Sequence, residues 1–230
     1  MMTVTIQDCA ERSPIYDLYG NAALTQLGNR PFVARYATGD ESEQLRRCGL
    51  VDLSNLPRVG FRGADSAAFL QARGYQLPEK PNRGTSQPSG ETVLRLSETE
   101  YFLLGSLTDG GERIATEESD WALGEQACYL LPRQDSHAWL ALTGAYLPQL
   151  MAKICGVDLR AEAFPAGAVA QTSVARLSAI VVNATTPGLP VFHILCDRAS
   201  AHYLWGTLLD AMDEWGGKPV GIEAVLDLVG

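Results

Sequence analysis

The feature that most constrains the fold of this chain is an internal repeat. Residues 59–70, with the sequence VGFRGADSAAFL, are echoed by residues 140–151, with the sequence LALTGAYLPQLM. Each copy has the pattern of a short alternating strand, a glycine corner and an amphipathic helix. A second echo pairs YFLLG at 101–105 with VFHIL at 191–195. Two copies of one pattern predict two similar α/β subdomains, packed about an approximate twofold axis with a pocket between them.

The periodicity predicts a β-α-β-β-α-β unit in the first half, and a strand, a helix, three strands and a closing helix in the second. The first unit has expected strands at 50–62, 92–96, 101–107 and 126–133, and helices at 64–72 and 111–119. The second has strands from 138 and at 169–174, 177–182 and 191–196, and helices at 147–155 and 199–214. The sequence therefore predicts an α+β fold with two ferredoxin-like subdomains, at 50–136 and 137–230. Gly63 and Gly144 are expected at equivalent strand-to-helix corners.

Residues 1–49 are predicted to form an irregular N-terminal segment, broken by Pro14 and Pro31. One short helix is expected within it, at 40–47. Asp40 is the expected N-cap of this helix, and Glu43 follows three residues later.

Charge and hydropathy exclude several functional classes. The net charge of −9 argues against non-specific binding to nucleic acid and to an anionic membrane surface. The longest apolar runs, such as 177–182, are far shorter than the roughly 20 residues of a membrane-spanning helix. Residues 1–12 have no apolar core of the signal-peptide type. We therefore expect a cytoplasmic protein.

The cysteines agree with this expectation. The five are odd in number and widely spaced, with no Cys-x-x-Cys pair, so neither a disulfide framework nor a zinc site is expected. Cys128, Cys155 and Cys196 lie among apolar residues and are predicted to be buried thiols.

Familiar catalytic and phosphate-binding motifs are missing: the sequence has no Gly-x-Gly-x-x-Gly, no phosphate loop, no His-x-x-x-His and no Gly-x-Ser-x-Gly. The three histidines have different settings. His137 starts a strand and is expected to be a turn residue, and His202 lies on the last helix, where exposure is expected. His193 interrupts an apolar strand, so it either finds a hydrogen-bond partner in the core or lines a pocket.

Several segments, in this order and spacing, resemble the glycine cleavage T-protein (aminomethyltransferase) family. The opening of that family is similar to SPIYDL at 13–18, CGLVDLS at 48–54 and VGFRGADSAAFL at 59–70. Its later strand and helix, with a Pro-x-Gly-x-x-Ala tail, are similar to FHILCDRASAHYLWGTLL at 192–209 and PVGIEA at 219–224.

Within the family, the likeness is greatest to the gamma subunit of heterotetrameric sarcosine oxidase and its relatives in N-methylglutamate dehydrogenases. It rests on GYQLP at 74–78 with Asn82 and Arg83, LRLSETEYFLLG at 94–105, and AFPAGAVAQT at 163–172. The resemblance implies a folate-binding, T-protein-like fold of one-carbon metabolism, without the C-terminal barrel domain that T-proteins have.

The resemblance also implies positions for ligand contacts. T-proteins bind tetrahydrofolate in a hole between their subdomains. Tyr75 and Gln76 match the family's Asn-Asp pair, and His193 matches its pterin-binding glutamate. An imidazole cannot accept two donors as a carboxylate does, so the folate contacts are altered. These three residues are the candidate cofactor-binding positions; no catalytic residue, metal or tightly bound cofactor is expected, and tetrahydrofolate is the candidate ligand.

Two hypotheses follow. The first is a non-catalytic accessory subunit of a folate-linked, amine-oxidising flavoenzyme, bound to larger flavin- and folate-bearing subunits. The second is a stand-alone folate-binding or aminomethyltransferase-like protein with altered folate ligands. The proline-rich stretch at 78–90 is either a contact element for such a partner or a solvated linker between a helix and a strand.

Overall fold

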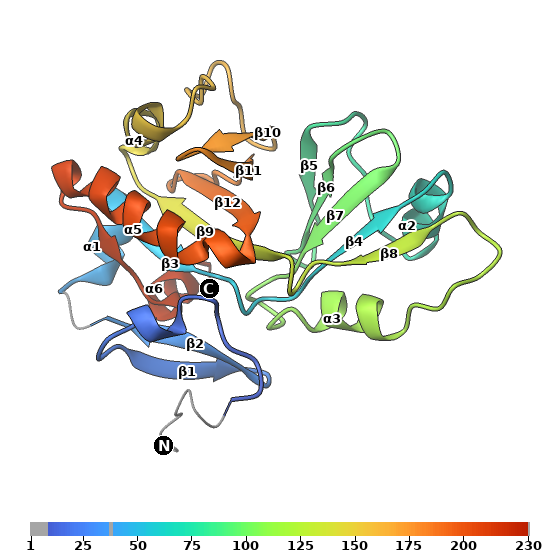
Figure 1. Ribbon diagram of the computed structural model, residues 1–230, viewed down its shortest axis with the longest axis horizontal. Coiled ribbons are helices and arrows are strands. Elements are labelled where there is room, and N and C mark those ends of the chain that lie inside the picture. The colour runs from blue at the N-terminus through green and yellow to red at the C-terminus, as the bar shows by residue number, and fades with distance from the viewer. Residues whose placement is uncertain (1–8, 37–38, 230) are drawn as a thin grey trace.

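Two main sheets lie side by side in the computed structural model, which describes residues 9–36 and 39–229. Each sheet has helices on its outer side, and a two-stranded hairpin lies below one of them (Figure 1). The α+β class and the two related halves are therefore as predicted.

The sheet of the first half has the order β5-β6-β7-β4-β8, with every neighbouring pair antiparallel. The predicted unit runs along the chain as β4-α2-β6-β7-α3-β8, and its strand order is that of a ferredoxin-like fold. Its elements are β4 (Arg58–Arg62), α2 (Ser66–Ala72), β6 (Thr92–Arg95), β7 (Glu100–Leu104), α3 (Glu112–Ser119) and β8 (Tyr129–Pro132).

The sheet of the second half has the order β10-β11-β12-β9-β3-β13. Its first four strands correspond in order and direction to β5-β6-β7-β4 of the first half. Its elements are β9 (His137–Thr143), α4 (Leu147–Ile154), β10 (Val169–Val174), β11 (Leu177–Asn183), β12 (Val191–Asp197), α5 (Ala201–Met212) and β13 (Lys218–Pro219).

Strand β3 (Gly49–Asp52) differs from the prediction: residues 50–52 are expected in the first subdomain, but the strand belongs to the sheet of the second half. It pairs antiparallel with β9, at the position that β8 occupies beside β4. Strand β13 then pairs in parallel on the other side of β3. All four residues of β3 are buried, as befits a strand with neighbours on both edges. Local periodicity indicated a strand here but could not indicate which sheet it joins.

The N-terminal segment is also more regular than predicted. It contains β1 (Ala23–Leu27) and β2 (Arg30–Arg35), which form the hairpin, and α1 (Glu41–Cys48). Asp40 caps α1 as expected: its Oδ1 accepts hydrogen bonds of 3.0 Å from the backbone N–H groups of Ser42 and Glu43. The last helix, α6 (Ile222–Val229), packs against β2 and α1.

The two corner glycines have equivalent surroundings. Gly63 and Gly144 have φ angles of +147° and +107°, which side chains with a Cβ rarely adopt. A Cβ on Gly63 would lie 2.0 Å from the carbonyl oxygen of Ala127, and one on Gly144 would lie 2.4 Å from that of Arg47. Ala127 comes just before β8 and Arg47 just before β3. The residues just before β3 and β8 therefore contact the two corner glycines in the same way, which supports the equivalence of these strands.

Side chains alternate along each strand between an outer and an inner core. The outer cores lie beneath α4 and α5 in the second half and beneath α2 and α3 in the first. The inner core lies between the two sheets. Leu140 and Leu142 of β9 face outward, for example, whereas Trp139 and Ala141 face the inner core. The inner core also contains Phe102 and Leu104 of β7, Leu195 of β12 and residues of α6.

Arg58 joins the two connections that cross between the sheets. Its guanidinium is fully buried and donates hydrogen bonds of 2.8–2.9 Å to the carbonyls of Ser54, Leu56 and Gln134, with a further one to that of His137. Burial lowers the pKa of Arg58 to about 10, so it stays charged at neutral pH.

The sheets also meet at their far edges, through the loop at 78–90. Part of that loop is β5 (Arg83–Ser86), an edge strand on β6. The N–H of Gly84 donates to the carbonyl of Gly167 over 2.8 Å, and the N–H of Val169 donates to that of Asn82 over 3.1 Å. The stretch is therefore not simply a solvated linker, because its backbone is hydrogen-bonded to the other half, and a contact between it and a partner subunit stays a prediction.

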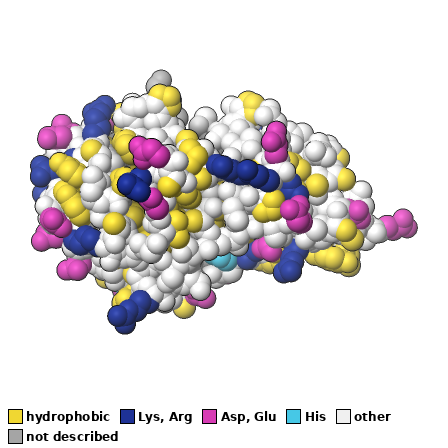
Figure 2. Space-filling view, turned by 90° about the horizontal axis from the view of Figure 1, so that it is seen from above, with side chains coloured by type: hydrophobic (Ala, Val, Ile, Leu, Met, Phe, Trp, Pro, Cys, Tyr) yellow, Lys and Arg dark blue, Asp and Glu magenta, His cyan; other side chains and the backbone are white. Residues whose placement is uncertain are grey.

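The structure bears on two other sequence-based expectations. Among the described residues, no helix is long and apolar enough to cross a membrane. Cys128, Cys155 and Cys196 are buried and outside any disulfide, as predicted. Figure 2 shows the two lobes from above, with charged side chains of both signs interspersed over this face.

Candidate functional site

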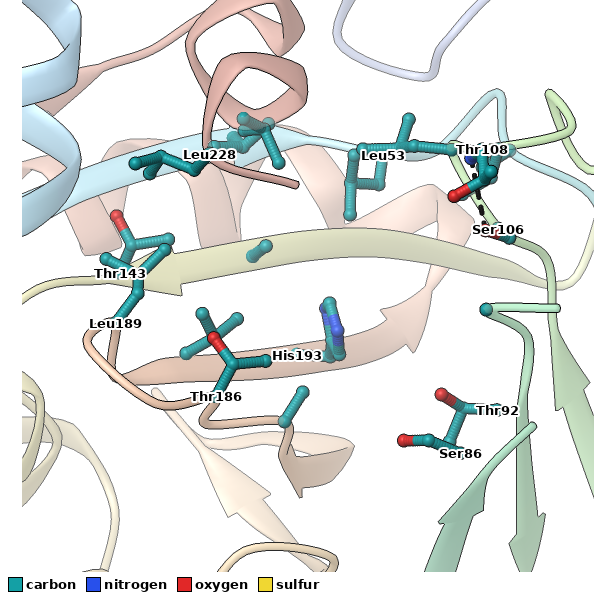
Figure 3. A pocket seen from close by; sticks show the side chains of 18 of the residues that line it. Leu53, Ser86, Thr92, Ser106, Thr108, Thr143, Thr186, Leu189, His193 and Leu228 are labelled. Carbon is teal, nitrogen blue, oxygen red and sulfur yellow. Dashed lines mark hydrogen bonds between the residues drawn. The ribbon is translucent and has the colours of Figure 1, made fainter. Parts of the chain in front are cut away.

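A cavity of about 530 Å³ lies where the two halves face each other. Strands of both sheets line it, together with the loops after β7 and β11 and one side of α6 (Figure 3). Its apolar wall comes from the inner core, from α6 and from the loops after β7 and β11: Val51, Leu53, Leu56, Leu107, Trp139, Ala141, Ala184, Pro187, Leu189, Val191, Val225 and Leu228. The size and the mixed lining are typical of a small-molecule site.

The polar lining consists mainly of hydroxyl groups. They belong to Ser86, Thr92, Ser106, Thr108, Thr143 and Thr186. The hydroxyl oxygen of Ser106 accepts a 3.1 Å hydrogen bond from the N–H of Thr108, which leaves its own hydrogen free to donate. The remaining polar side chains are Arg46 and His193, and the described lining residues include no Asp or Glu.

His193 lies at the centre of this lining. It sits on β12 between Val191 and Leu195, so the alternation of the strand turns its ring toward the opposite sheet. Figure 3 shows the ring standing up from β12 into the cavity. The indole N–H of Trp139 donates a 2.9 Å hydrogen bond to Nδ1, and the two rings meet edge to face at 5.2 Å. The sequence left open a core partner or a pocket position, and the structure shows both.

The protonation state of His193 follows from this contact. An indole N–H can only donate, so Nδ1 must be unprotonated and the ring proton is on Nε2. Burial disfavours the imidazolium and lowers the pKa of His193 to about 4. At neutral pH the ring is therefore uncharged and has one N–H, on Nε2.

The other two candidate residues lie elsewhere. Tyr75 is buried in the outer core of the first half, with the Arg113 guanidinium 4.2 Å from its ring centre. Gln76 is held by a side chain: its N–H donates to Oε1 of Gln87, and its carbonyl accepts from Nε2 of Gln87, both over 2.9 Å. Neither residue lines the cavity. Their role in cofactor binding stays a prediction, without support from this geometry.

Sequence reasoning missed most of the cavity. Ser86 and Thr92 come from β5 and the start of β6, and Thr186 from the loop after β11. Isolated Ser and Thr residues give no signal of their own, because they are common in exposed turns. The one available signal was the repeat, which predicts a pocket between the halves but not its lining.

The remaining histidines lie outside this cavity. His202 is exposed, as predicted, and its Nε2 lies 2.9 Å from a carboxylate oxygen of Asp17. His137 begins β9, where its Nδ1 lies 2.8 Å from the Ser136 hydroxyl and its ring meets Phe102 edge-on at 5.3 Å. Burial, assisted by Arg133 and Arg58, lowers the pKa of His137 to about 4.

Comparison with known protein families shows to which family the chain belongs. The model of the GCVT N-terminal domain matches residues 89–228, which is more than half of the chain. The chain belongs to this family. The resemblance inferred from the sequence is thereby confirmed, and so is the T-protein-like fold.

The relatives fall into two groups. The aminomethyltransferase of Anoxybacillus flavithermus is 27% identical over 93% of this chain but only 62% of its own length. The sarcosine oxidase subunit gamma of Corynebacterium sp. strain P-1 is 27% identical over 74% of this chain and 83% of its own length. The chain thus spans less than two thirds of the aminomethyltransferase.

Two similar solved structures belong to these same groups. A chain of the heterotetrameric sarcosine oxidase from Corynebacterium sp. U-96 matches with a TM-score of 0.65 and 21% identity, covering 90% of this chain and 97% of that one. The glycine cleavage system aminomethyltransferase T of Bartonella henselae matches with a TM-score of 0.70 and 20% identity, covering 92% of this chain and 59% of that one. At these identities the matches show the shared fold.

Proposed function

We propose that this chain is a non-catalytic accessory subunit of a sarcosine oxidase-like, folate-linked flavoenzyme that oxidises an amine in the cytoplasm. The observation that favours this role is the match to a chain of heterotetrameric sarcosine oxidase, which covers 97% of that chain. The chain spans only about 60% of the length of the aminomethyltransferase relatives, so their activity is not carried over to it as a whole. The partners proposed are the larger flavin- and folate-bearing subunits of such a complex.

The chemistry of the cavity supports a non-catalytic role. Transfer of an aminomethyl group requires proton transfers, and a useful general acid or base has a pKa near the working pH. The titratable side chains that line this cavity are Arg46 and His193. A histidine with a pKa of about 4 is a weak base at neutral pH, and the hydroxyl groups around it are weaker still. The lining is thus better suited to binding than to proton transfer.

A turnover assay tests the non-catalytic part of the proposal. The purified chain is supplied with tetrahydrofolate and an aminomethyl donor, beside an active aminomethyltransferase as the positive control. We expect no methylenetetrahydrofolate above the enzyme-free rate. Robust turnover by this chain alone would contradict the proposal.

A specific observation favours a second candidate function, a stand-alone folate-binding or aminomethyltransferase-like protein. His193, at the family's pterin position by resemblance, does line a cavity of about 530 Å³ between the halves. Titration of the chain and of its His193→Phe variant with tetrahydrofolate, followed by calorimetry, separates the two candidates. Tight binding that the His193→Phe variant loses would favour the second.

A further inference from the structure

We propose that this cavity binds an aromatic carboxylate, and that Nε2–H of His193 donates a hydrogen bond to it. The site would therefore select ligands whose buried edge accepts hydrogen bonds. This inference concerns the cavity alone and does not depend on the accessory role proposed above.

The first step is the fixed direction of the His193 hydrogen bond. Trp139 occupies Nδ1 with a donor that cannot act as an acceptor. If the proton were on Nδ1 of His193, two N–H donors would face each other, one from each ring. Among the described residues no hydrogen-bond partner is recorded for Nε2, and the ring faces the cavity. Nε2–H therefore presents a donor to whatever occupies the cavity.

The second step is the balance of donors and acceptors in the rest of the lining. Hydroxyl groups of Ser86 and Thr92, on the opposite sheet, stand across the cavity from His193 in Figure 3. Hydroxyls can donate or accept, and that of Ser106 is left to donate. The described lining side chains include no carboxylate that could accept strongly. A ligand with many acceptors thus pairs with more of this lining than a ligand with many donors.

The third step is charge. Arg46 lines the cavity and is itself exposed, and no ion pair is recorded for it within the described part of the chain. Because the described lining contains this cation and no Asp or Glu, a ligand carboxylate meets a positive side chain and no negative one in the cavity wall, whereas a ligand cation meets the reverse. The rest of the wall is aliphatic and aromatic, which suits a planar apolar body. Together these features describe an aromatic carboxylate.

Three probes with the same naphthalene ring and different charges test the inference: 2-naphthoate, neutral 2-naphthamide and cationic 2-naphthylmethylamine. Their dissociation constants for the full chain are measured by calorimetry at pH 7.5 and low salt. We expect 2-naphthoate to bind at least about tenfold more tightly than the amine, with the amide between them. Equal affinities, preference for the amine, or no binding of 2-naphthoate at about 1 mM would overturn the inference.

Substitutions at His193 locate the donor. In His193→Gln the amide nitrogen can replace the donor at Nε2, so 2-naphthoate binding should stay within about threefold. In His193→Glu an acceptor with negative charge replaces the donor, and binding should weaken at least about tenfold. The matched control is His202→Glu, which adds the same charge at an exposed site outside the cavity. Similar losses in the two His193 variants would contradict the donor role.

A spectroscopic measurement does not depend on these variants folding. Long-range proton–nitrogen NMR of the histidine rings reports which ring nitrogen is protonated. We expect one protonated nitrogen in His193, identified as Nε2, with a resonance that shifts on addition of 2-naphthoate. A proton on Nδ1, or an unshifted Nε2 at saturating ligand, would overturn the inference.

Discussion

At the scale of single residues, Arg58 is the most exacting position in the chain. It is fully buried and satisfies carbonyls on both connections between the sheets. In Arg58→Met those carbonyls lose their donors, and each buried unpaired group costs about 1–3 kcal/mol. Part of this cost is offset because no charge remains to be desolvated. We expect the free energy of unfolding in urea to fall by about 2–4 kcal/mol.

Two further variants sharpen that test. In Arg58→Lys a single ammonium group cannot span both connections as the guanidinium does, so a loss of similar size is expected. Arg62→Met is the control, because Arg62 is on the same strand but its side chain is 66% exposed and 3.9 Å from Glu100. A change in stability at Arg58 as small as that at Arg62 would show that the guanidinium is not what ties the connections together.

The histidines predict a pH dependence of stability. Burial lowers the pKa values of His137 and His193 to about 4, whereas an unfolded histidine titrates near 6.5. Between these values the unfolded chain binds protons that the folded chain does not. The free energy of unfolding that depends on these neutral imidazoles is therefore fully present above about pH 6.5. It decreases as the pH falls from there toward about 4.

Urea unfolding between pH 8 and pH 4.5 measures this dependence. His137→Gln and His193→Gln should each flatten the decline in stability below about pH 6.5. Their stabilities at pH 8, where all forms are neutral, report the change in packing alone. Variants that retain the full slope would show that these imidazoles are protonated in the folded protein.

Residue by residue, the sequence predicted the site unevenly. His193 could be found because a lone histidine in an apolar strand demands either a partner or a pocket, and it has both. Tyr75 and Gln76 were placed by resemblance in a loop, where the side-chain direction is not set by any periodicity. The structure turns Tyr75 into the outer core and pairs Gln76 with Gln87.

At the scale of elements, the repeat predicts two equivalent, sterically demanding corners. In Gly63→Ala and Gly144→Ala the new Cβ meets backbone carbonyls at 2.0 and 2.4 Å, at φ angles unfavourable for alanine. We expect each to lower the free energy of unfolding by at least about 2 kcal/mol, because backbone cannot move aside as a side chain can. Chemical denaturation measures both.

The helical Gly206 provides the control for these corners. It is exposed within α5, and a Cβ there would meet nothing within 4 Å. Gly206→Ala should therefore raise stability by up to about 1 kcal/mol, through helix propensity alone. A mild effect at only one corner would mean that the two are not equivalent.

Most elements could be predicted, since strand and helix periodicities are local properties of the sequence. The expected helix at 147–155, for instance, is α4 (Leu147–Ile154), and the strand at 169–174 is β10. What could not be predicted was the partner of a strand. Strand β3 precedes β4 by a few residues yet lies in the other sheet, because burial beside β9 and β13 stabilises it there. Such pairing is decided by tertiary contacts.

At the scale of the whole molecule, two similar halves enclose one cavity. They are joined at the connections held by Arg58 and at the edges of β5 and β10. Helix α6 packs against the N-terminal hairpin and gives Val225 and Leu228 to the cavity wall. The fold is that of the GCVT N-terminal domain family. The accessory role is proposed because the chain is also similar to a sarcosine oxidase subunit gamma.

Affinity purification of the tagged chain from its native host, followed by native mass spectrometry, tests this account most directly. A stable complex of this kind buries on the order of 1,200 Å² or more, so it should survive purification. We predict a stoichiometric assembly that contains a larger subunit with flavin absorbance. Recovery of this chain by itself, as a monomer without any flavoprotein, would contradict the accessory-subunit role.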